Sequence, residues 1–285
     1  MMQLAITGAT SGIGAETAKA LAPKCSQIFL LVRNVEKARE LVQRLDPLGT
    51  QKKFTIVPCD LTDLHSVARA ANTLTEATDT LDLLINNAGG IFPKKKLTGD
   101  GHERTFSANH LGHFLLTVLL LPLLTHGTGG QVINVSSEAH KGAGIDPDDL
   151  ELTQTYSSFK AYANAKLYNI LFTKSLAEKY ADQHLEAYAV HPGVVNTGFG
   201  SESKGIFKIL LSLFKPLMIG PAKGAETSVF LATTAKVPGK NGAYFKKSKT
   251  ASVSSKARSK KLRDRLWEYS MEQVHAYLPA HSSSS

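Results

Sequence analysis

The chain has 285 residues and a formal net charge of +9, from 33 Lys and Arg against 24 Asp and Glu. Its 42% hydrophobic and 20% charged residues are ordinary for a globular protein of this length and exclude a disordered or fibrous chain. Two cysteines, Cys25 and Cys59, are too few for a disulfide scaffold or a four-cysteine zinc site, and they indicate a reducing, intracellular setting.

Short apolar runs alternate with longer segments of helical periodicity. The runs predict strands at 4–7, 28–32, 54–57, 81–85, 132–135 and 186–190, with a seventh at 242–245. The helical spacing predicts helices near 13–22, 35–45, 63–78, 101–124 and 157–181. Several strands are apolar on both faces, as in a buried parallel sheet. We therefore expect an α/β fold over residues 1–285 as a single domain, a Rossmann-type doubly wound parallel sheet of about seven strands with helices on both faces.

Irregular stretches follow three of these strands. Residues 87–100, 137–156 and 191–205 come after the fourth, fifth and sixth predicted strands. Ligands of open parallel sheets bind in the crevice beyond the carboxyl ends of the strands. We therefore expect these three stretches to line one crevice.

A glycine-rich turn joins the first predicted strand to the first predicted helix. It reads Thr-Gly-Ala-Thr-Ser-Gly-Ile-Gly over residues 7–14. Glycines let the backbone turn tightly and approach a pyrophosphate, whose charge then lies at the helix N-terminus. The spacing is G-x-x-x-G-x-G rather than G-x-G-x-x-G, but a place between a strand and a helix is the required context. The residues that we expect to hold a dinucleotide here are Gly8, Thr10, Ser11, Gly12, Ile13 and Gly14.

The residues after the second predicted strand indicate which dinucleotide binds. An acidic residue there would hold the ribose hydroxyls of NAD(H), but the chain reads Val-Arg-Asn over residues 32–34. Arg33 can pair with a 2′-phosphate and stack on adenine, which favours NADP(H); the alternative is a plain surface cation. The further cofactor contacts that we expect are Asn34, then Asp60 and Leu61 after the third strand, and Asn87, Ala88 and Gly89 after the fourth.

Two Tyr-x-x-x-Lys sequences lie at the last long predicted helix, Tyr156 with Lys160 and Tyr162 with Lys166. Either would place its Tyr and Lys one turn apart on one helix face. Six residues rotate a helix by about 600°, so the two tyrosines point to different sides and only one pair can face a bound cofactor. Small alanines flank the lysine and tyrosine of the second pair, and this favours it because they allow a close approach.

Taken together and in this order, these residues resemble the classical type of the short-chain dehydrogenase/reductase superfamily over roughly residues 3–245. The stretches 109–117 and 132–140 most resemble its retinol dehydrogenase-like branch, which includes the WW-domain oxidoreductase relatives. Residues 167–177 resemble the run that follows the catalytic Lys in that branch, which selects the second Tyr-x-x-x-Lys pair. The branch generally uses NADP(H) where an Arg stands at the position of Arg33, in agreement with the charge argument.

The resemblance implies a catalytic set of Asn109, Ser137, Tyr162 and Lys166. Tyr162 would act as general acid and base, and Ser137 would donate a hydrogen bond to the developing oxyanion while Ser136 points away. Lys166 would hold the nicotinamide ribose and lower the pKa of the Tyr162 phenol, because a cation favours phenolate. The backbone of Asn109 would support a water linked to Lys166. Further cofactor contacts implied after the sixth strand are Pro192, Gly193, Val195 and Thr197.

Two further segments are expected to shape the substrate site. Residues 142–155 resemble an insertion typical of this branch and would border the entrance. Residues near 198–220 stand where this family places its substrate lid, and the run 206–219 within them is mostly apolar, with Lys208 and Lys215 as its charged residues. A helix packed on its own domain or a patch touching a membrane are the alternatives for this second segment. An apolar lid indicates an apolar small-molecule substrate.

Most of the net positive charge lies near the C-terminus, in the basic segment 246–285 and just before it. Residues 240–285 contain ten Lys and Arg but only three acidic residues. Such a segment could bind nucleic acid or an anionic membrane, or form a solvated helix; since no nucleic-acid fold signature accompanies it, we expect no nucleic-acid partner. The apolar runs 114–124 and 206–219 are interrupted, and the chain begins at its first strand without a signal-peptide pattern. We therefore expect no transmembrane anchor and a cytoplasmic protein.

These observations predict an NADP(H)-dependent alcohol dehydrogenase or carbonyl reductase for a largely apolar small molecule, with no metal because the histidines lack ligand spacing. The alternative is a non-catalytic NADP(H)-binding sensor or scaffold. Such proteins typically lose the Tyr or the Lys, and this chain has both. Family members often pair through the helices that contain Asn109 and Tyr162, which implies a homodimer or homotetramer.

Overall fold

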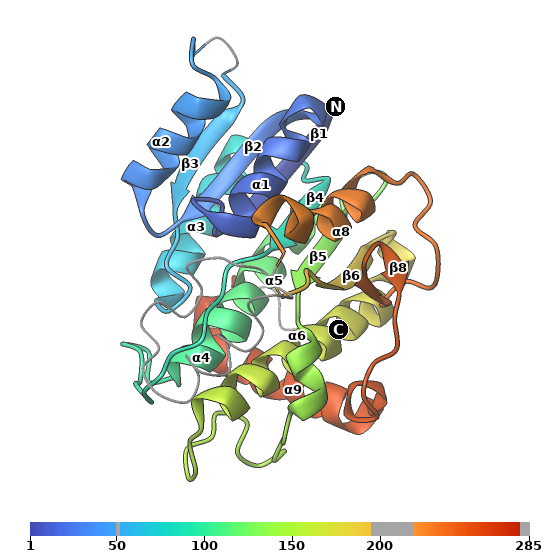
Figure 1. Cartoon of the computed structure of the whole chain (residues 1–285). Helices are drawn as coiled ribbons and strands as arrows, with labels where there is room; N and C mark the ends of the chain where they lie inside the picture. Colours follow the sequence, from blue (N-terminus) through green and yellow to red (C-terminus); the bar gives the residue numbers. More distant parts are fainter. Residues whose placement is uncertain (50–51, 195–218, 280–285) are drawn as a thin grey trace.

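The centre of the computed structural model, which describes residues 1–49, 52–194 and 219–279, is one eight-stranded sheet (Figure 1). The strand order is β3-β2-β1-β4-β5-β6-β7-β8. All neighbouring strands pair in parallel except β8, which is antiparallel to β7. The strands are β1 (Met2–Thr7), β2 (Cys25–Val32), β3 (Phe54–Pro58), β4 (Leu83–Asn86), β5 (Gln131–Val135), β6 (Glu186–His191), β7 (Tyr244–Lys246) and β8 (Lys249–Thr250). The predicted Rossmann-type fold is confirmed, with β8 as an additional short strand.

The strand order reverses at β1, and this reversal determines where a ligand can bind. β1 pairs with β2 on one side and with β4 on the other, so the chain winds outward in one direction and then in the other. Ligands of such sheets bind at this switch point, beyond the carboxyl ends of the strands. The glycine turn after β1 and the polar turn after β4 are therefore neighbours at the expected crevice.

Helices cover both faces of the sheet (Figure 1). Apart from helical segments of five residues or fewer, the described helices are α1 (Gly12–Leu21), α2 (Val35–Leu45), α3 (Leu64–Ala77), α5 (Gly112–Leu124), α6 (Ser158–Lys179), α8 (Pro221–Thr233) and α9 (Lys260–Val274). One apolar core joins α3, α5, α6 and α9 to the sheet, and a second joins α1, α2 and α8 to its other face. The sequence periodicity predicts α1, α2, α3, α5 and α6 but does not identify α8.

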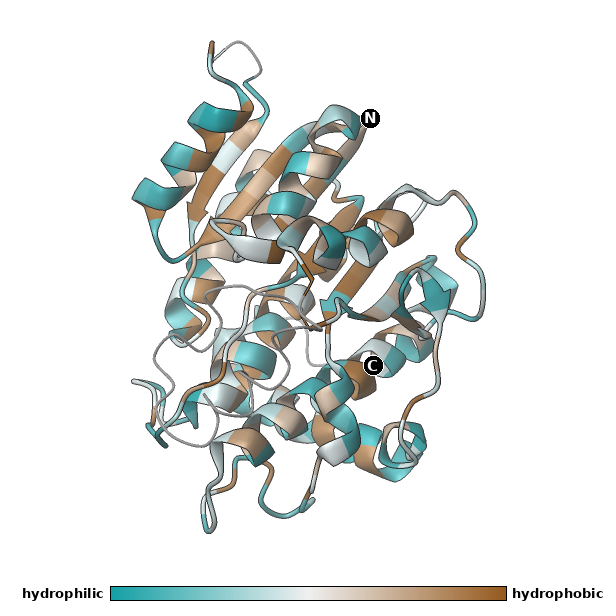
Figure 2. Ribbon diagram, in the orientation of Figure 1, coloured by the Kyte–Doolittle hydropathy of each residue, from teal (hydrophilic) through white to brown (hydrophobic). Residues whose placement is uncertain are grey.

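Alternation along the strands divides the apolar side chains between the two cores. In β2, Phe29 and Leu31 belong to the core under α5 and α6, while Ile28 and Leu30 belong to the core under α1 and α8. Successive side chains of a strand point to opposite faces, so a strand covered on both faces must be apolar throughout. Figure 2 shows the result, an apolar sheet enclosed by helices with hydrophilic outer faces.

The single helix predicted at 101–124 consists of three parts. A short helix α4 (Arg104–Phe106) leads into a π-helical segment, Ser107–Leu111, and then into α5. The backbone N–H of Gly112 donates to the carbonyl of Ser107, five residues back, which is the π-helical pattern. The turn after β3 contacts this segment, because the Ser107 hydroxyl donates to the carbonyl of Leu61 at 3.0 Å. Such π-helical segments often mark functional sites, and this one contains Asn109.

One helical stretch, Arg104–Leu124, is long and apolar enough to cross a bilayer on length and composition alone. However, 83% of its apolar window is buried inside the protein. Pro122 lies within it, and the side chains that surround it belong to the larger core. The same composition is found in buried core helices of folded proteins, and this stretch is such a helix in the described part of the chain.

The basic C-terminal segment packs against the body of the protein. The ring of Trp267 in α9 lies 5.1 Å from that of Phe114 in α5 and 6.1 Å from that of Phe172 in α6. Its cations bond to the chain itself: Lys256 Nζ donates to the Ala143 carbonyl at 2.6 Å, and Arg265 Nε donates to the Pro147 carbonyl at 3.3 Å. α9 thus covers part of the α5 and α6 surface through which family members are expected to pair.

Replacement of Trp267 by Ala should lower the free energy of unfolding by about 2 kcal/mol, since it removes a half-buried indole that joins α9 to both helices. Urea denaturation followed by far-ultraviolet circular dichroism measures the change. Glu268→Ala, at the exposed neighbouring position of α9, is the matched control and should change stability by less than about 0.5 kcal/mol. Equal effects of the two variants would contradict the docking of α9.

Candidate active site

The glycine turn and the turn after β4 pack directly against each other. Gly8 and Gly12 have φ of +67° and +57°, a backbone conformation that glycine adopts without strain. A Cβ on Gly8 would lie 2.9 Å from the Cα of Ala88, so a side chain there would separate the two turns. The Asn87 side chain donates to the carbonyl of Thr7 at 2.9 Å and closes the contact.

The N-terminus of α1 is suited to a negatively charged group. Ser11 is its N-cap residue, and its side chain makes no capping hydrogen bond. The first backbone N–H groups of a helix have no partner within it, and the helix dipole adds positive potential there. Ile13 and Gly14 lie in this first turn, and Thr10 precedes it. The cradle therefore fits the pyrophosphate of a dinucleotide, as the sequence predicts.

The next predicted cofactor residues lie along the same edge of the sheet. Thr7, the last residue of β1, pairs with Leu31 of β2, so Arg33 lies just beyond the end of β2, beside the glycine turn. The Arg33 side chain is exposed. Asn34 caps α2, its side chain accepting from the Lys37 N–H at 3.0 Å. The Asp60 carboxylate accepts from both the N–H and the hydroxyl of Thr62, at 2.9 and 2.8 Å, and so shapes the turn after β3.

Ser137, Tyr162 and Lys166 come together at the carboxyl end of β5. Ser137 follows β5 and caps the short helix Glu138–Gly142, and its hydroxyl lies within hydrogen-bonding reach of the Tyr162 phenol. Tyr162 and Lys166 lie one turn apart on α6, with the Lys166 Nζ 5.4 Å from the Tyr162 ring centre. Lys166 is almost fully buried, and its Nζ donates to the Val135 carbonyl at 3.1 Å. The structure thus brings a phenol, a hydroxyl and an ammonium group together at this end of the strand.

Asn109 fastens the π-helical segment to the turn after β4. Its side chain donates to the carbonyl of Gly90 at 3.0 Å and to that of Thr105 at 2.9 Å, and it accepts from the N–H of Gly90 at 3.1 Å. A Cβ on Gly89 would lie 2.5 Å from the Asn109 side-chain oxygen and 3.4 Å from the Lys166 Nζ. Asn109 and Lys166 therefore both approach the backbone of Gly89.

The expectation that Lys166 lowers the pKa of Tyr162 is wrong for the protein alone. Burial raises the pKa of the Tyr162 phenol to about 12, with a smaller opposing contribution from its hydrogen bond to Ser137. Burial also lowers the pKa of Lys166 to about 8. A charge that loses its water is disfavoured, so burial shifts both pKa values toward the neutral forms. Near neutral pH the phenol is therefore protonated, and Lys166 is largely charged.

The two adjacent serines face different partners. Ser136 is buried, and its hydroxyl donates to the backbone carbonyl of Lys166 at 2.6 Å. Asn169, one turn further along α6, donates to the Val135 carbonyl that also accepts from Lys166. Ser136 and Asn169 thus hold α6 against β5. Sequence analysis did not identify Asn169, although it lies three residues after Lys166 on the same helix.

The competing Tyr156 and Lys160 lie elsewhere. The Tyr156 hydroxyl donates to the carbonyl of Phe92 at 3.1 Å and lies 3.3 Å from the Thr105 hydroxyl. Tyr156 precedes α6 and joins the segment after β4 to α4, whereas Lys160 lies on the first turn of α6 near Gly144. This pair does not share the contacts that join Tyr162 to Ser137.

The residues after β6 are described only in part. Pro192 and Gly193 follow the strand, and Gly193 has φ of +96°. Val195 and Thr197 lie outside the described residues, as does the predicted lid near 198–220 apart from its last two residues. The N–H of Ile219 donates to the Val194 carbonyl at 2.9 Å, so the chain returns to this end of β6 after the segment.

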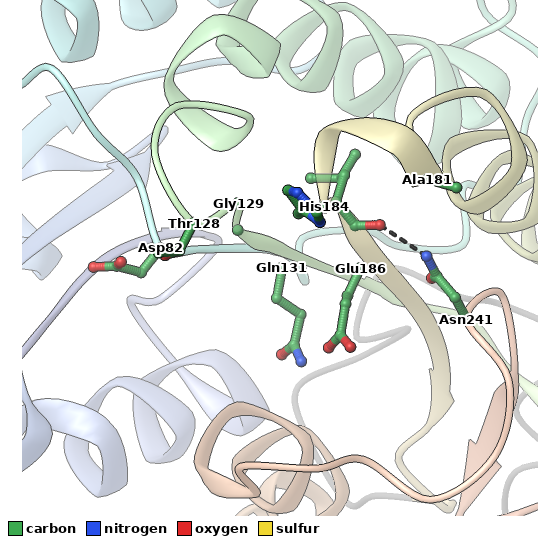
Figure 3. Close-up of a pocket in the computed structure, with 10 residues that line it drawn as sticks. Asp82, Thr128, Gly129, Gln131, Ala181, His184, Glu186 and Asn241 are labelled. Atoms are coloured by element: carbon green, nitrogen blue, oxygen red, sulfur yellow. Dashed lines mark hydrogen bonds between the residues drawn. The ribbon is translucent and has the colours of Figure 1, made fainter.

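A cavity of about 470 Å³ lies at the opposite edge of the sheet (Figure 3). Asp82 precedes β4, while Gln131 and Glu186 begin β5 and β6, so their side chains mark the amino ends of these strands. Figure 3 shows Gln131 and Glu186 side by side in its wall. Since Ser137 follows the carboxyl end of β5, this cavity is separate from the candidate active site.

Comparison with known proteins agrees with this geometry. A model described as short chain dehydrogenase matches residues 3–205. Retinol dehydrogenase 12 from Mus musculus is 38% identical over 267 residues, which cover 94% of this chain and 84% of that protein. Retinol dehydrogenase 13 from Homo sapiens is 34% identical over 282 residues, covering 96% and 85%.

Solved structures share the fold. The crystal structure of an uncharacterized protein from Mycobacterium Paratuberculosis has a TM-score of 0.77 and 31% identity, covering 96% of this chain and 94% of that one. NADPH-bound carbonyl reductase from chicken fatty liver has a TM-score of 0.64 and 24% identity, covering 86% and 95%, and is similar in fold.

Two buried histidines beside the site should make the protein sensitive to mild acid. Burial lowers the pKa of His110 and of His113 to about 3, from about 6.5 in an unfolded chain. The unfolded state therefore takes up more protons below pH 6.5, and stability present above that pH is lost as the pH falls toward 3. By pH 5 the loss should be on the order of 2 kcal/mol per histidine.

Urea unfolding at pH 7 and pH 5 measures this loss, with variants that remove one titrating group. His110→Gln should reduce the difference in unfolding free energy between the two pH values. His126→Gln is the matched control, because His126 is exposed, and should leave the difference unchanged. An unchanged difference in His110→Gln would show that this group does not titrate on unfolding.

Proposed function

The chain belongs to the short-chain dehydrogenase/reductase family, within its retinol dehydrogenase-like branch, and from this membership we propose an NADP(H)-dependent enzyme that interconverts a carbonyl and an alcohol on a largely apolar small molecule. The convergence of Ser137, Tyr162 and Lys166 at the switch point carries the proposal. The glycine cradle and the open N-terminus of α1 lie on the same edge of the sheet.

In carbonyl reduction, the hydride adds to the carbonyl carbon, and negative charge develops on the oxygen. NADPH, when bound, supplies the hydride. The Tyr162 phenol donates its proton to that oxygen, and the Ser137 hydroxyl stabilises the charge with a hydrogen bond. The Lys166 ammonium holds a ribose hydroxyl and stabilises the phenolate that remains on Tyr162. In alcohol oxidation the same proton moves back to the phenolate.

The raised pKa of Tyr162 fits the role of a proton donor in carbonyl reduction. With a pKa near 12, the phenol carries its proton at neutral pH and is ready to act as an acid. Acting as a base for alcohol oxidation would first require the phenolate, which burial disfavours.

The described part of the entrance supports an apolar substrate. Phe159 on α6 is 44% exposed and lies beside Gly142 in the 142–155 insertion. Phe92, in the segment after β4, is partly exposed as well, with the Arg104 guanidinium 3.9 Å from its ring centre. Aromatic walls with few polar groups are typical of sites for apolar ligands.

We also propose that the enzyme is cytoplasmic and does not use its C-terminal segment to bind nucleic acid or membranes. The reason is that Lys256 and Arg265 donate to carbonyl groups of the 142–155 insertion, and Lys246 pairs with Glu138 at 3.1 Å. A phosphate surface would have to compete with these internal partners.

Because α9 covers part of the pairing surface, we propose a monomer in place of the expected homodimer or homotetramer.

NADPH consumption against a panel of aldehydes and ketones tests the activity. The panel should include retinal, a steroid ketone, a quinone and small aromatic aldehydes, each paired with its alcohol and NADP⁺ for the reverse reaction. Faster turnover of apolar carbonyls than of small polar ones is expected. Tight binding of NADPH with no turnover of any carbonyl would favour a non-catalytic sensor.

The charge beside the glycine turn predicts the choice of cofactor. NADPH should bind at least tenfold more tightly than NADH, a difference of about 1.4 kcal/mol, because Arg33 can pair with the 2′-phosphate. Arg33→Asp should reverse the preference, as measured by fluorescence titration with each cofactor. Arg39→Asp makes the same charge change at an exposed position of α2 and should leave the ratio near its original value. Equal binding of both cofactors by the unaltered protein would refute the prediction.

The duplicated Tyr-x-x-x-Lys sequence provides an internal control for the catalytic residue. Tyr162→Phe keeps the ring but removes the proton donor, so kcat should fall at least about a hundredfold while NADPH binding persists. Tyr156→Phe removes a hydroxyl that donates to Phe92, and it should change kcat only modestly. Steady-state kinetics with the best substrate of the panel distinguish the two. The reverse pattern would mean that the wrong pair has been assigned.

A further inference from the structure

His113 lies between the two halves of the site. It is the second residue of α5 and is almost fully buried. Its Nε2 is 2.9 Å from the Thr7 hydroxyl, at the end of β1, and its Nδ1 is 3.3 Å from the backbone carbonyl of Asn109. One imidazole ring therefore touches the strand that leads into the glycine turn and the residue expected to be catalytic on the π-helical segment.

The partners of His113 determine which nitrogen carries the proton. A backbone carbonyl can only accept a hydrogen bond, so Nδ1 must carry the hydrogen that is donated to Asn109. In the neutral ring Nε2 then has a lone pair, and it accepts the hydroxyl hydrogen of Thr7. An imidazolium would have hydrogen on both nitrogens, so the Thr7 hydroxyl would have to turn to its other acceptor, the Ile85 carbonyl at 3.5 Å.

The orientation of the Thr7 hydroxyl has a consequence for the turn after β4. The hydroxyl oxygen accepts from the backbone N–H groups of Asn87 and Ala88, at 2.9 and 3.0 Å. With its hydrogen directed to His113, the Thr7 hydroxyl makes three hydrogen bonds and is saturated. His113 thus fixes the rotation of a hydroxyl that holds the turn beneath the glycine cradle.

We propose that neutral His113 is a positioning residue that couples the cofactor turn to the catalytic helix by bonding Thr7 and the Asn109 carbonyl at the same time. The kinetic consequences of this inference rest on the proposed function, whereas the hydrogen bonds of His113 do not depend on it. A histidine that only filled space would have no need of two polar partners on separate elements. The bond to Thr7 acts on the turn that would hold the cofactor, and the bond to the Asn109 carbonyl acts on the segment that contains Asn109.

Two substitutions separate the two hydrogen bonds. The Asn side-chain nitrogen can occupy the place of Nδ1, so His113→Asn keeps the donor to Asn109 and loses the contact to Thr7. Gln reaches as far as Nε2, so His113→Gln keeps the contact to Thr7 and loses the donor to Asn109. Thr7→Val removes the hydroxyl with little change in shape and serves as the matched partner variant.

NADPH affinity, measured by fluorescence titration, tests the Thr7 bond without any substrate. His113→Asn should weaken NADPH binding by about fivefold to tenfold. Thr7→Val should weaken it at least as much, because it also removes the acceptor of the Asn87 and Ala88 N–H groups. The double variant should bind no more weakly than Thr7→Val alone, since the bond between His113 and Thr7 is already lost in that variant. His113→Gln should retain affinity within about threefold but lower kcat by about tenfold on a panel carbonyl, with KM little changed. Additive losses in the double variant, or equal behaviour of Asn and Gln, would overturn the coupling.

The protonation state is tested on the intact enzyme by nitrogen-15 NMR of labelled histidine. The His113 signal, assigned by its disappearance in His113→Gln, should show a neutral ring with hydrogen on Nδ1 between pH 6 and 8. A ring with hydrogen on Nε2, or an imidazolium, would refute the proposal. If no carbonyl is reduced, the NADPH and NMR measurements still decide the role of His113, so failure of the proposed function and failure of this inference are distinguishable.

Discussion

A buried line of amide and hydroxyl side chains crosses the sheet beneath the site and holds both of its helices. Asn86 of β4 donates to Thr117 of α5 at 3.0 Å and to Asn134 of β5 at 2.8 Å, and Asn134 donates to Thr173 of α6 at 2.9 Å. All four side chains are buried, so a slip of either helix would leave polar groups without partners, at a cost of about 1–3 kcal/mol each. Lys166 on α6 and Asn109 before α5 take their positions from this constraint.

The same burial sets the chemistry of the site. Lys166 is placed by burial against β5, and burial lowers its pKa to about 8 while it raises that of Tyr162 to about 12. An argument from the Tyr–Lys pair alone predicts the opposite direction for Tyr162, because it counts attraction between charges and leaves out their loss of water. Burial therefore keeps the Tyr162 phenol in its protonated form near neutral pH.

Sequence patterns predict those features that depend on neighbouring residues. The apolar runs located the parallel strands because strands buried on both faces are apolar throughout, and the glycine turn was recognisable because its positive φ values require glycine. The sequence patterns do not predict the π-helical segment. Its Ser107 hydroxyl donates to the carbonyl of Leu61, which is far away in sequence, so a local pattern does not include this contact. The role of His113 is not visible in the sequence for the same reason: its polar partner Thr7 lies on another element.

The basic C-terminal segment shows how charge composition can mislead. A surplus of Lys and Arg at one end of a chain suggests an external anion, yet here Lys256 and Arg265 donate to carbonyls of the 142–155 insertion. Tyr269 of α9 donates to the Glu151 carboxylate at 2.7 Å, and that carboxylate also accepts from the N–H of Glu103 at 2.7 Å. The insertion lies between Ser137 and Tyr162 in the sequence, so the C-terminal segment holds in place part of the chain that joins these two residues. Long cations suit this task because each spans several ångströms with an apolar stem and satisfies a carbonyl at its tip.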